Sequence, residues 1–592
     1  MLKKALLLSA FIFTACIAGA QTTFLPLGSE DYRILDRIET LSGRLSDTVA
    51  NVDKPISRRS AIRFIEGLQD NMSDTLPTGA ALRARYSSID LYNMQQMMSE
   101  SSEWTRTEEG AVDSKRSWFN TFYKKQYDFV YKKGFYFFIV ANPVFNGTAL
   151  VQQTNPTADP VTGTSIPRLV VGNSHGAEAR GWISKRIGFY TMFTDNQEQL
   201  PYSVNSYVTK KYQAIQGMDY YKRPISQFGT YDYFQAIGYV NFDLIRDHVN
   251  TTFGYGKNFI GDGISSLFLT DNSSSMPYLK IQASFWHLNY ECLYLELTPQ
   301  FIKGADKPLV HKYSSMRYVS WNATKTLTLG FFEGEVFGRT TGYEISYLNP
   351  LILTTTVNRY NGAGDKSLLG FNVKKILGHQ VQLYGQFIFN EFRFKELTST
   401  RGWYGNKFGV QAGAKYFNAF GIRNLDLQGE VDAVRPYTYA AQDTIANYTN
   451  YNQPLADPLG SGFIKTIGVL RYSPVRNFYI TAKATYYIRG NDIDSTNYGN
   501  DVFKPYPSAT NQYGVRMING GKSSCQIMSL NLSYQVRRNI FFDLGGTYRR
   551  YVSEAGIYPI SSTTGVLNGP QTTNYVYFGL RINASRRDYD FF

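Results

Sequence analysis

The sequence predicts an all-β protein: a large transmembrane antiparallel β-barrel of about eighteen strands, with a small N-terminal α-helical periplasmic subdomain. The first observation is alternation. In 425–433 apolar residues alternate with Asp426, Glu430 and Asp432, and the same period of two recurs at 480–488. The second observation is that such half-polar segments continue over several hundred residues, with no second set of elements to cover their apolar faces. Because backbone groups at membrane depth must be paired, these strands have to close into a barrel with the polar face inward.

Composition is the third observation. The 592 residues are 16% aromatic and include 50 glycines, yet the mean hydropathy is only −0.30, which is typical of half-polar strands with aromatic girdles. No apolar run after the first twenty residues is long enough for a transmembrane helix. The net charge of +14 indicates contact with anionic lipid headgroups or acidic polysaccharide; the alternative is basic residues at strand ends that reach lipid phosphates. We expect no nucleic-acid partner.

The chain starts with a predicted secretory signal peptide, residues 1–20. Lys3 and Lys4 precede an apolar run, and small residues at 18–20 form a cleavage site. Cys16 raises the alternative of a lipoprotein, but the residues before it make a poor lipidation motif. A barrel with a cleaved leader belongs in an outer membrane, where we expect lipid and the barrel-insertion machinery as partners.

Residues 21–115 predict helices at 29–43, 57–68 and about 80–98, which pack as a periplasmic plug or subdomain at the barrel mouth. Arg58, Arg59 and Arg63 cluster on the second helix; they either bind an acidic polymer or form a solvated face. We expect that removal of this subdomain leaves a foldable barrel with raised conductance, because strand pairing does not depend on it.

The barrel itself is predicted over residues 116–592. Besides 425–433 and 480–488, candidate strands lie at 135–150, 168–183, 187–194, 231–244, 250–258, 278–289, 292–301, 313–322, 326–336, 368–376, 380–392, 406–417, 462–473, 527–536, 540–548 and 574–584. Short polar breaks at 418–421, 474–477 and 537–539 predict turns at one end. Long tracts at 437–461, 489–522 and 552–573 predict loops at the other end, and both termini are expected in the periplasm.

The alternation also predicts which side chains face lipid. These are Leu425, Leu427, Val431, Ile480, Ala482, Ala484, Leu530, Leu532, Val536, Val576, Phe578 and Leu580. The last strand precedes an unusual charged tail, 586–590, and a terminal Phe592 that resembles a signal for barrel insertion. Cys292 and Cys525 lie in strand-like segments, where small buried thiols are expected.

Nothing in the sequence requires an enzyme, a cofactor or a metal. The five histidines are scattered without metal-ligand spacing. Asn173, Ser174 and His175 bring to mind a lipolytic Ser/His/Asn site, but neighbouring residues of a strand face opposite sides and cannot meet. The acidic residues of 425–433 are better explained by charge pairing inside the lumen.

Several ordered segments resemble the Wzi family of capsule-assembly outer-membrane proteins. They are GYGKNFIGDG at 254–263, SLFLTDN at 266–272, YLNP at 347–350, GDKSLLGF at 364–371, RPYTY at 435–439 and NQPLADPLG at 452–460. The chain departs from the family pattern at Lys366, Asn390 and Asp457, where Asn, Asp and His are expected. The resemblance implies a large barrel closed by helices at the periplasmic side, which anchors capsular polysaccharide at the cell surface.

Three functions are therefore open: a polysaccharide-binding protein of capsule assembly, a component of gliding-motility or surface-secretion machinery, and a solute porin. The polysaccharide-binding candidates are Tyr437, Tyr439, Tyr448, Tyr451, Asn452 and Gln453. Their rings suit sugar faces and their amides suit hydroxyl groups. The alternative is that the tyrosines belong to an interfacial girdle.

Overall fold

The computed structural model describes residues 22–74, 77–106, 122–125, 127–158, 165–184, 186–208, 214–218, 220–222, 230–299, 309–339, 342–362, 364–391, 393–399, 401–493, 496–554 and 570–589. The predicted leader 1–20 with Cys16, the segment 107–121 and the terminal Phe592 lie outside these residues. Among the helices described, none is long and apolar enough to cross a membrane.

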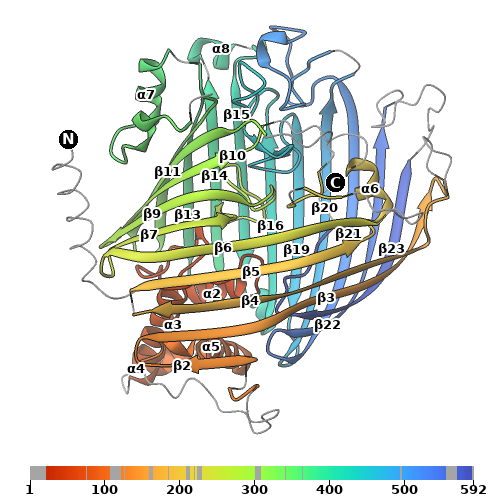
Figure 1. Ribbon diagram of the computed structural model, residues 1–592. Coiled ribbons are helices and arrows are strands. Elements are labelled where there is room, and N and C mark those ends of the chain that lie inside the picture. Colours follow the sequence, from red (N-terminus) through yellow and green to blue (C-terminus); the bar gives the residue numbers. More distant parts are fainter. Residues whose placement is uncertain are drawn as a thin grey trace.

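The protein is a closed antiparallel barrel of eighteen strands, as predicted (Figure 1). The last strand pairs with β3 and closes the wall, and the short β2 adds to β3. The strands are β2 (Val130–Lys133), β3 (Phe137–Asn155), β4 (Leu169–Ile183), β5 (Ile187–Glu198), β6 (Tyr231–Ile245), β7 (Val249–Gly256), β9 (Met276–Phe285), β10 (Leu288–Leu297), β11 (Lys312–Thr324), β12 (Leu327–Phe337), β13 (Lys366–Leu377), β14 (Val381–Glu391), β15 (Lys407–Tyr416), β16 (Leu425–Val434), β19 (Phe463–Tyr472), β20 (Phe478–Asn491), β21 (Gly521–Arg537), β22 (Ile540–Ser553) and β23 (Gln571–Ile582).

The two ends of the barrel differ as expected. At one end the strands are joined by short turns, and Asn418, Asn477 and Asn539 take the left-handed backbone conformation there, which asparagine tolerates. At the other end the connections are long, for example 257–275, 338–365, 435–462 and 492–520. Short turns face the periplasm in outer-membrane barrels, so the long connections face the exterior of the cell.

The predicted register is confirmed. Along β16 Asp426, Glu430 and Asp432 are buried inside, whereas Val431 is exposed on the outer face. All twelve residues expected to face lipid lie on the outward side of their strands and are half-buried or exposed. The outer face is therefore an apolar band suited to acyl chains, and the lumen is polar.

The N-terminal helices are α2 (Asp31–Ser42), α3 (Arg58–Ser73), α4 (Pro77–Ala84) and α5 (Ser88–Glu100), followed by η2 (Ser102–Trp104). Gly43 ends α2 in the left-handed conformation, and the Ser60 N–H donates to the Ser57 hydroxyl at the start of α3. The prediction of a single helix at about 80–98 is wrong, because the structure has two helices there, α4 and α5. Ser87 and Asp90 form a capping box that starts α5 separately from α4.

These helices form one apolar core at the short-turn end, and they also enter the lumen (Figure 1). The two-residue β1 (Asp53–Lys54) pairs with β8 (Phe259–Ile260), which belongs to the connection after β7. The expectation that no strand pairing depends on the subdomain is therefore wrong for β8, although it holds for the barrel wall. We call residues 22–106 the plug.

Two of the three arginines of α3, Arg59 and Arg63, hold the plug on the barrel, whereas Arg58 makes its contacts within the plug. Arg58 is buried and donates to the Phe24 carbonyl and the Ser101 hydroxyl. Arg59 lies 3.1 Å from Asp243 and Arg63 lies 3.0 Å from Asp247, both at the end of β6. The solvated-face interpretation therefore holds in part for Arg63, whose side chain is 47% exposed, and not for Arg58 and Arg59.

The remaining helices belong to the long connections. They are α6 (Tyr202–Tyr207), η5 (Ile345–Leu348), α7 (Thr354–Tyr360), α8 (Phe394–Thr398) and η7 (Tyr506–Ser508), while η6 (Ala419–Gly421) lies in a short turn and β17 (Thr449–Asn450) pairs with β18 (Gln453–Pro454). After β23 ends beside the plug, the described residues 583–589 do not continue into the periplasm, where the sequence places the C-terminus. Residues 583–589 turn back into the lumen, where Tyr589 donates to Glu198 at the far end of β5.

Candidate binding site

Two long connections fold into the lumen from the extracellular end. They are 257–275, after β7, and 435–462, after β16. Tyr439 and Tyr448 donate from their hydroxyls to the carbonyls of Leu267 and Phe268, at 2.8 and 2.7 Å. The Phe268 ring stacks on Phe332 of the barrel wall, with centroids 4.6 Å apart. The two connections thus form one continuous apolar core with the inner face of the barrel.

Buried lysines of the wall hold the 435–462 connection in place. Lys366 donates to the carbonyls of Thr438 and Ala440, at 2.7 and 2.9 Å. Lys312 donates to the carbonyl and side-chain oxygen of Asn447, both at 2.7 Å. Lys366 is one of the departures from the Wzi family pattern, and here its ammonium group has a clear structural use.

The six predicted binding residues therefore do not project into solvent. Tyr437, Tyr439 and Tyr448 have no exposed surface. Tyr451, Asn452 and Gln453 are also buried, at 8% exposure or less. They line the interior of a packed connection and form no interfacial girdle. Direct contact of these residues with polysaccharide stays a prediction.

The glycine-rich segment 254–263 is packed just as tightly. The N–H groups of Ile264 and Ser265 donate to Glu430 of β16, at 2.7 and 3.0 Å. A Cβ atom on Gly263 would lie 2.6 Å from the Ser265 backbone carbonyl and 2.4 Å from the Glu430 carboxylate, so only glycine allows this approach. Asp262 accepts a hydrogen bond from Asn372 at 3.1 Å. This segment is the structural centre of the lumen.

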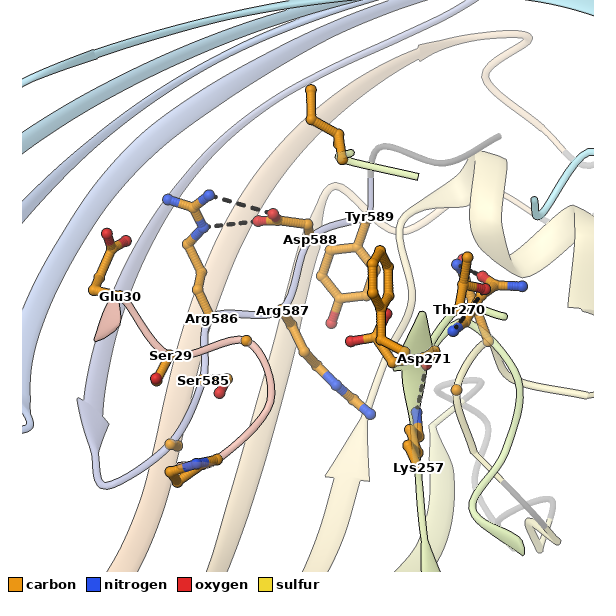
Figure 2. Close-up of a pocket in the computed structure, with 18 of the residues that line it drawn as sticks. Ser29, Glu30, Lys257, Thr270, Asp271, Ser585, Arg586, Arg587, Asp588 and Tyr589 are labelled. Atoms are coloured by element: carbon orange, nitrogen blue, oxygen red, sulfur yellow. Dashed lines mark hydrogen bonds and ion pairs between the residues drawn. The ribbon is translucent and has the colours of Figure 1, made fainter. Parts of the chain in front are cut away.

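A cavity of about 430 Å³ remains beside the C-terminal tail (Figure 2). Arg586 and Asp588 form an ion pair at 2.7 Å, and Lys257 donates to the Asp271 carbonyl at 3.1 Å. Arg587 pairs with Glu198 across the lumen. Burial opposes ionisation of Asp588, but the Arg586 charge holds the pKa of Asp588 below its usual value. The tail divides the lumen, since neighbouring cavities of about 340 and 350 Å³ also touch Arg586.

The Ser174 and His175 side chains, which the sequence places next to each other, lie on opposite faces of β4. Ser174 lines a lumen cavity, whereas His175 lies on the outer face within 3.9 Å of Asp195, so the two cannot act together. In the described part of the chain no group of three His, Cys, Asp or Glu side chains could hold a metal ion. Cys292 and Cys525 are free and buried, as predicted.

Above the filled lumen, the connections 393–406 and 496–520 present exposed arginines and the exposed Tyr513, with the buried Trp403 beneath Arg393. The Arg393 guanidinium lies 4.7 Å from the Trp403 ring centroid, and the Arg401 guanidinium lies 4.9 Å from that of Tyr513. The Gly514 N–H donates to the Arg401 carbonyl at 2.8 Å, which ties the two connections together. Arg516 is exposed on the same connection as Tyr513. We call Arg393, Arg401, Tyr513 and Arg516 the loop-end surface.

Sequence reasoning missed this surface. Its arginines are single residues in two connections that are far apart in the chain, and only the fold brings them together. The predicted loop lies directly below it, because Tyr404 packs edge-on against the Tyr437 ring at 5.8 Å. The segment RGWYGN at 401–406, which is aromatic and basic and lies in a predicted strand connection, could have indicated this surface.

A closed antiparallel barrel with an apolar outer band, a polar lumen and an internal plug defines the class: this is an outer-membrane β-barrel protein. No family model matches the sequence, and no curated protein sequence matches it either.

Among solved structures the chain is similar to Wzi of Escherichia coli, described as an outer-membrane protein involved in group 1 capsule assembly and a carbohydrate-binding β-barrel. The two are 12% identical with a TM-score of 0.54, over 95% of this chain and 100% of that chain. OccAB2 of Acinetobacter baumannii follows at 8% identity and a TM-score of 0.40, over 74% of this chain and 97% of that chain. OprD of Pseudomonas aeruginosa is 11% identical with a TM-score of 0.38, over 74% of this chain and 94% of that chain. At these identities the similarity to Wzi establishes the fold alone.

Proposed function

We propose that the protein binds and anchors an acidic surface polysaccharide at the extracellular end of the barrel, as part of capsule assembly. The observation that carries the proposal is the loop-end surface, which presents three exposed arginines and an exposed tyrosine above a filled lumen. The fold of the carbohydrate-binding protein Wzi supports the same conclusion.

The chemistry of this surface suits acidic sugars. A guanidinium group binds a carboxylate or phosphate through two parallel hydrogen bonds, and an aromatic ring packs on the C–H face of a sugar. Arg401 is held against Tyr513 and by an ion pair with Glu396 at 2.7 Å, which an acidic sugar would have to share or replace, and Arg393 is held against Trp403. Because these pairs are preorganised, less conformational entropy is lost when a polymer binds.

The filled lumen favours binding over solute diffusion. The plug, the two inward connections and the C-terminal tail all occupy space that a porin would leave open. A component of gliding or secretion machinery would use the same barrel with stable protein partners. A gentle pull-down distinguishes the two functions, since the machinery component should bring down stable protein partners and a polysaccharide anchor does not need such partners.

The test is a variant with Arg393→Gln, Arg401→Gln, Tyr513→Ala and Arg516→Gln, expressed in cells that lack the wild-type gene. We expect normal heat-modifiable mobility of the barrel and loss of surface polysaccharide. Affinity for the purified polymer should fall by at least about a thousandfold, since each of the three arginines loses charge-assisted hydrogen bonds of about 1.5–3 kcal/mol.

The matched control removes three exposed arginines at the opposite, short-turn end: Arg83→Gln, Arg186→Gln and Arg246→Gln. It has the same net charge change as the test variant and should retain polysaccharide. If both variants retain polysaccharide equally, the loop-end surface is not the binding site.

A further inference from the structure

The connection between β12 and β13 lies on the outside of the barrel, against its wall. The register pairs Cys292 of β10 with Arg317 of β11, and Arg317 with Glu333 of β12. Their strand neighbours Met316 and Phe332 point inward to the core of the lumen. Because side chains of a strand alternate between faces, Arg317 and Glu333 point outward, to the side where lipid lies.

Residues 342–362, which we call the outer flap, cover these charges. Arg317 donates to the Tyr347 and Asn349 carbonyls, at 3.2 and 2.6 Å. The N–H and hydroxyl of Thr355 both donate to Glu333, at 3.0 Å. As a result Arg317 is only 5% exposed and Glu333 only 1%.

The covered charges lie within the apolar band. Along the hydrogen-bonded register Glu333 lies opposite Leu369, which lies opposite Phe389, and both are outward-facing apolar residues. The flap also reaches toward the short turns, since the Tyr290 hydroxyl, close to the start of β10, donates to the Pro350 carbonyl. An uncovered arginine at this depth of the outer face is strongly unfavourable, so the flap has to lie in the membrane.

The other side of the flap is apolar and exposed. Leu351 is 88% exposed and Ile345 is 79% exposed. Leu348, Ile352 and Leu353 are exposed beside them. In water such a row would be costly, whereas it continues the apolar outer surface of the neighbouring strands.

We propose that the outer flap is a membrane-inserted element whose apolar row contacts the acyl chains of the lipid bilayer. Arg317 and Glu333, on the barrel wall, hold its polar side. This goes beyond polysaccharide binding: the barrel has a second layer on one side, and its lipid-facing surface there is made by a connection instead of by strands.

The first test places an environment-sensitive fluorophore on Ile345→Cys and on Leu351→Cys, in protein folded into vesicles with brominated acyl chains. Val576→Cys on the outer face of β23 is the lipid control, and Gln512→Cys in an extracellular connection is the water control. We expect quenching by brominated lipid within about a factor of two of the lipid control. Quenching by aqueous iodide, as in the water control, would overturn the proposal. Protection that appears only in native membranes would indicate a protein partner and would also overturn it.

The second test uses the native Cys292, which faces outward and has no exposed surface beneath the flap. Cys525, inside the lumen core, is the internal control. Arg317→Met removes the two bonds to the flap, and we expect the rate of Cys292 alkylation by a membrane-permeant reagent to rise about tenfold while Cys525 stays protected. An unchanged rate in a correctly folded variant would show that Arg317 does not hold the flap.

Discussion

At the scale of single residues, β16 shows how far alternation can be taken. It predicts that Asp426 and Glu430 point into the lumen, and the structure confirms this. Asp426 meets Arg37 of the plug, so charge pairing is also confirmed. Glu430, however, accepts two backbone N–H groups, from Ile264 and Ser265, which are about 165 residues away in the chain. A partner that is a backbone group in a distant connection leaves no pattern in the sequence.

Asp128, just before β2, gives a prediction at the same scale. It is 3% exposed, and burial raises its pKa to about 7; the Arg180 charge opposes this shift, and Glu103 and Glu100 add to it. A raised pKa means that its contribution to stability is fully present below 3.8, the usual value, and is lost as pH rises through about 7. Asp128→Asn should therefore unfold in urea with a free energy up to about 4 kcal/mol higher than wild type at pH 8, and with little difference at pH 4.

The control for this prediction is Asp70→Asn, which changes an exposed carboxylate on the plug. Its free energy of unfolding should follow wild type at both pH values. If Asp128→Asn changes stability equally at pH 4 and pH 8, the substitution acts through packing and not through the charge.

At the scale of elements, the alternation predicts where the strands lie, but it predicts their exact ends less well. Alternation places the turn between β9 and β10 near 290, but the chain turns at Trp286, which has a positive φ of 53°. A tryptophan in that conformation gives no turn signal. The split between α4 and α5 has a local cause, the capping box at Ser87, which a helical pattern alone does not reveal.

The inward connections were not predictable as such. The 435–462 segment has the polar, aromatic composition of a solvated loop, and its burial depends on Lys312 and Lys366 from β11 and β13. Buried ammonium groups that bond to carbonyls satisfy both sides of the contact. The loop-end surface was missed for the same reason: it is assembled by tertiary contacts alone.

These contacts change what replacement of Tyr437, Tyr439, Tyr448 and Tyr451 by alanine should do. Loss of four buried rings and of the hydroxyl bonds to 267–268 should release the connection from the lumen. We expect single-channel conductance to rise, while heat-modifiable mobility stays normal because the wall is intact.

Replacing the exposed Tyr136 and Tyr360 with alanine is the control and should leave conductance unchanged. If the fourfold variant loses polysaccharide retention with no change in conductance, the tyrosines contact the polymer directly and the connection is not the seal.

At the scale of the whole molecule, the barrel and its plug are one electrostatic unit. Lys280, Lys374 and Lys415 point into the lumen and pair with plug carboxylates at 2.6, 2.7 and 2.6 Å. Part of the basic charge of the chain is therefore neutralised inside, which composition could not reveal. The sequence predicted a barrel, an outer-membrane location and N-terminal helices, but it did not predict that the helices complete the interior.

Deletion of residues 22–106 tests this integration. The eighteen wall strands pair with one another, so the barrel should still close, with raised conductance in planar bilayers. Its stability should fall, because three lumen lysines lose carboxylate partners and each charge-assisted hydrogen bond contributes about 1.5–3 kcal/mol. Adding Lys415→Met to the deletion should recover part of the urea midpoint, because its carboxylate partner Asp36 belongs to the plug, whereas Lys280 and Lys374 keep Glu291 and Asp262. A full-length protein that already conducts like an open porin would contradict the filled lumen. A Lys415→Met substitution without benefit would show that the plug acts through apolar packing instead of charge.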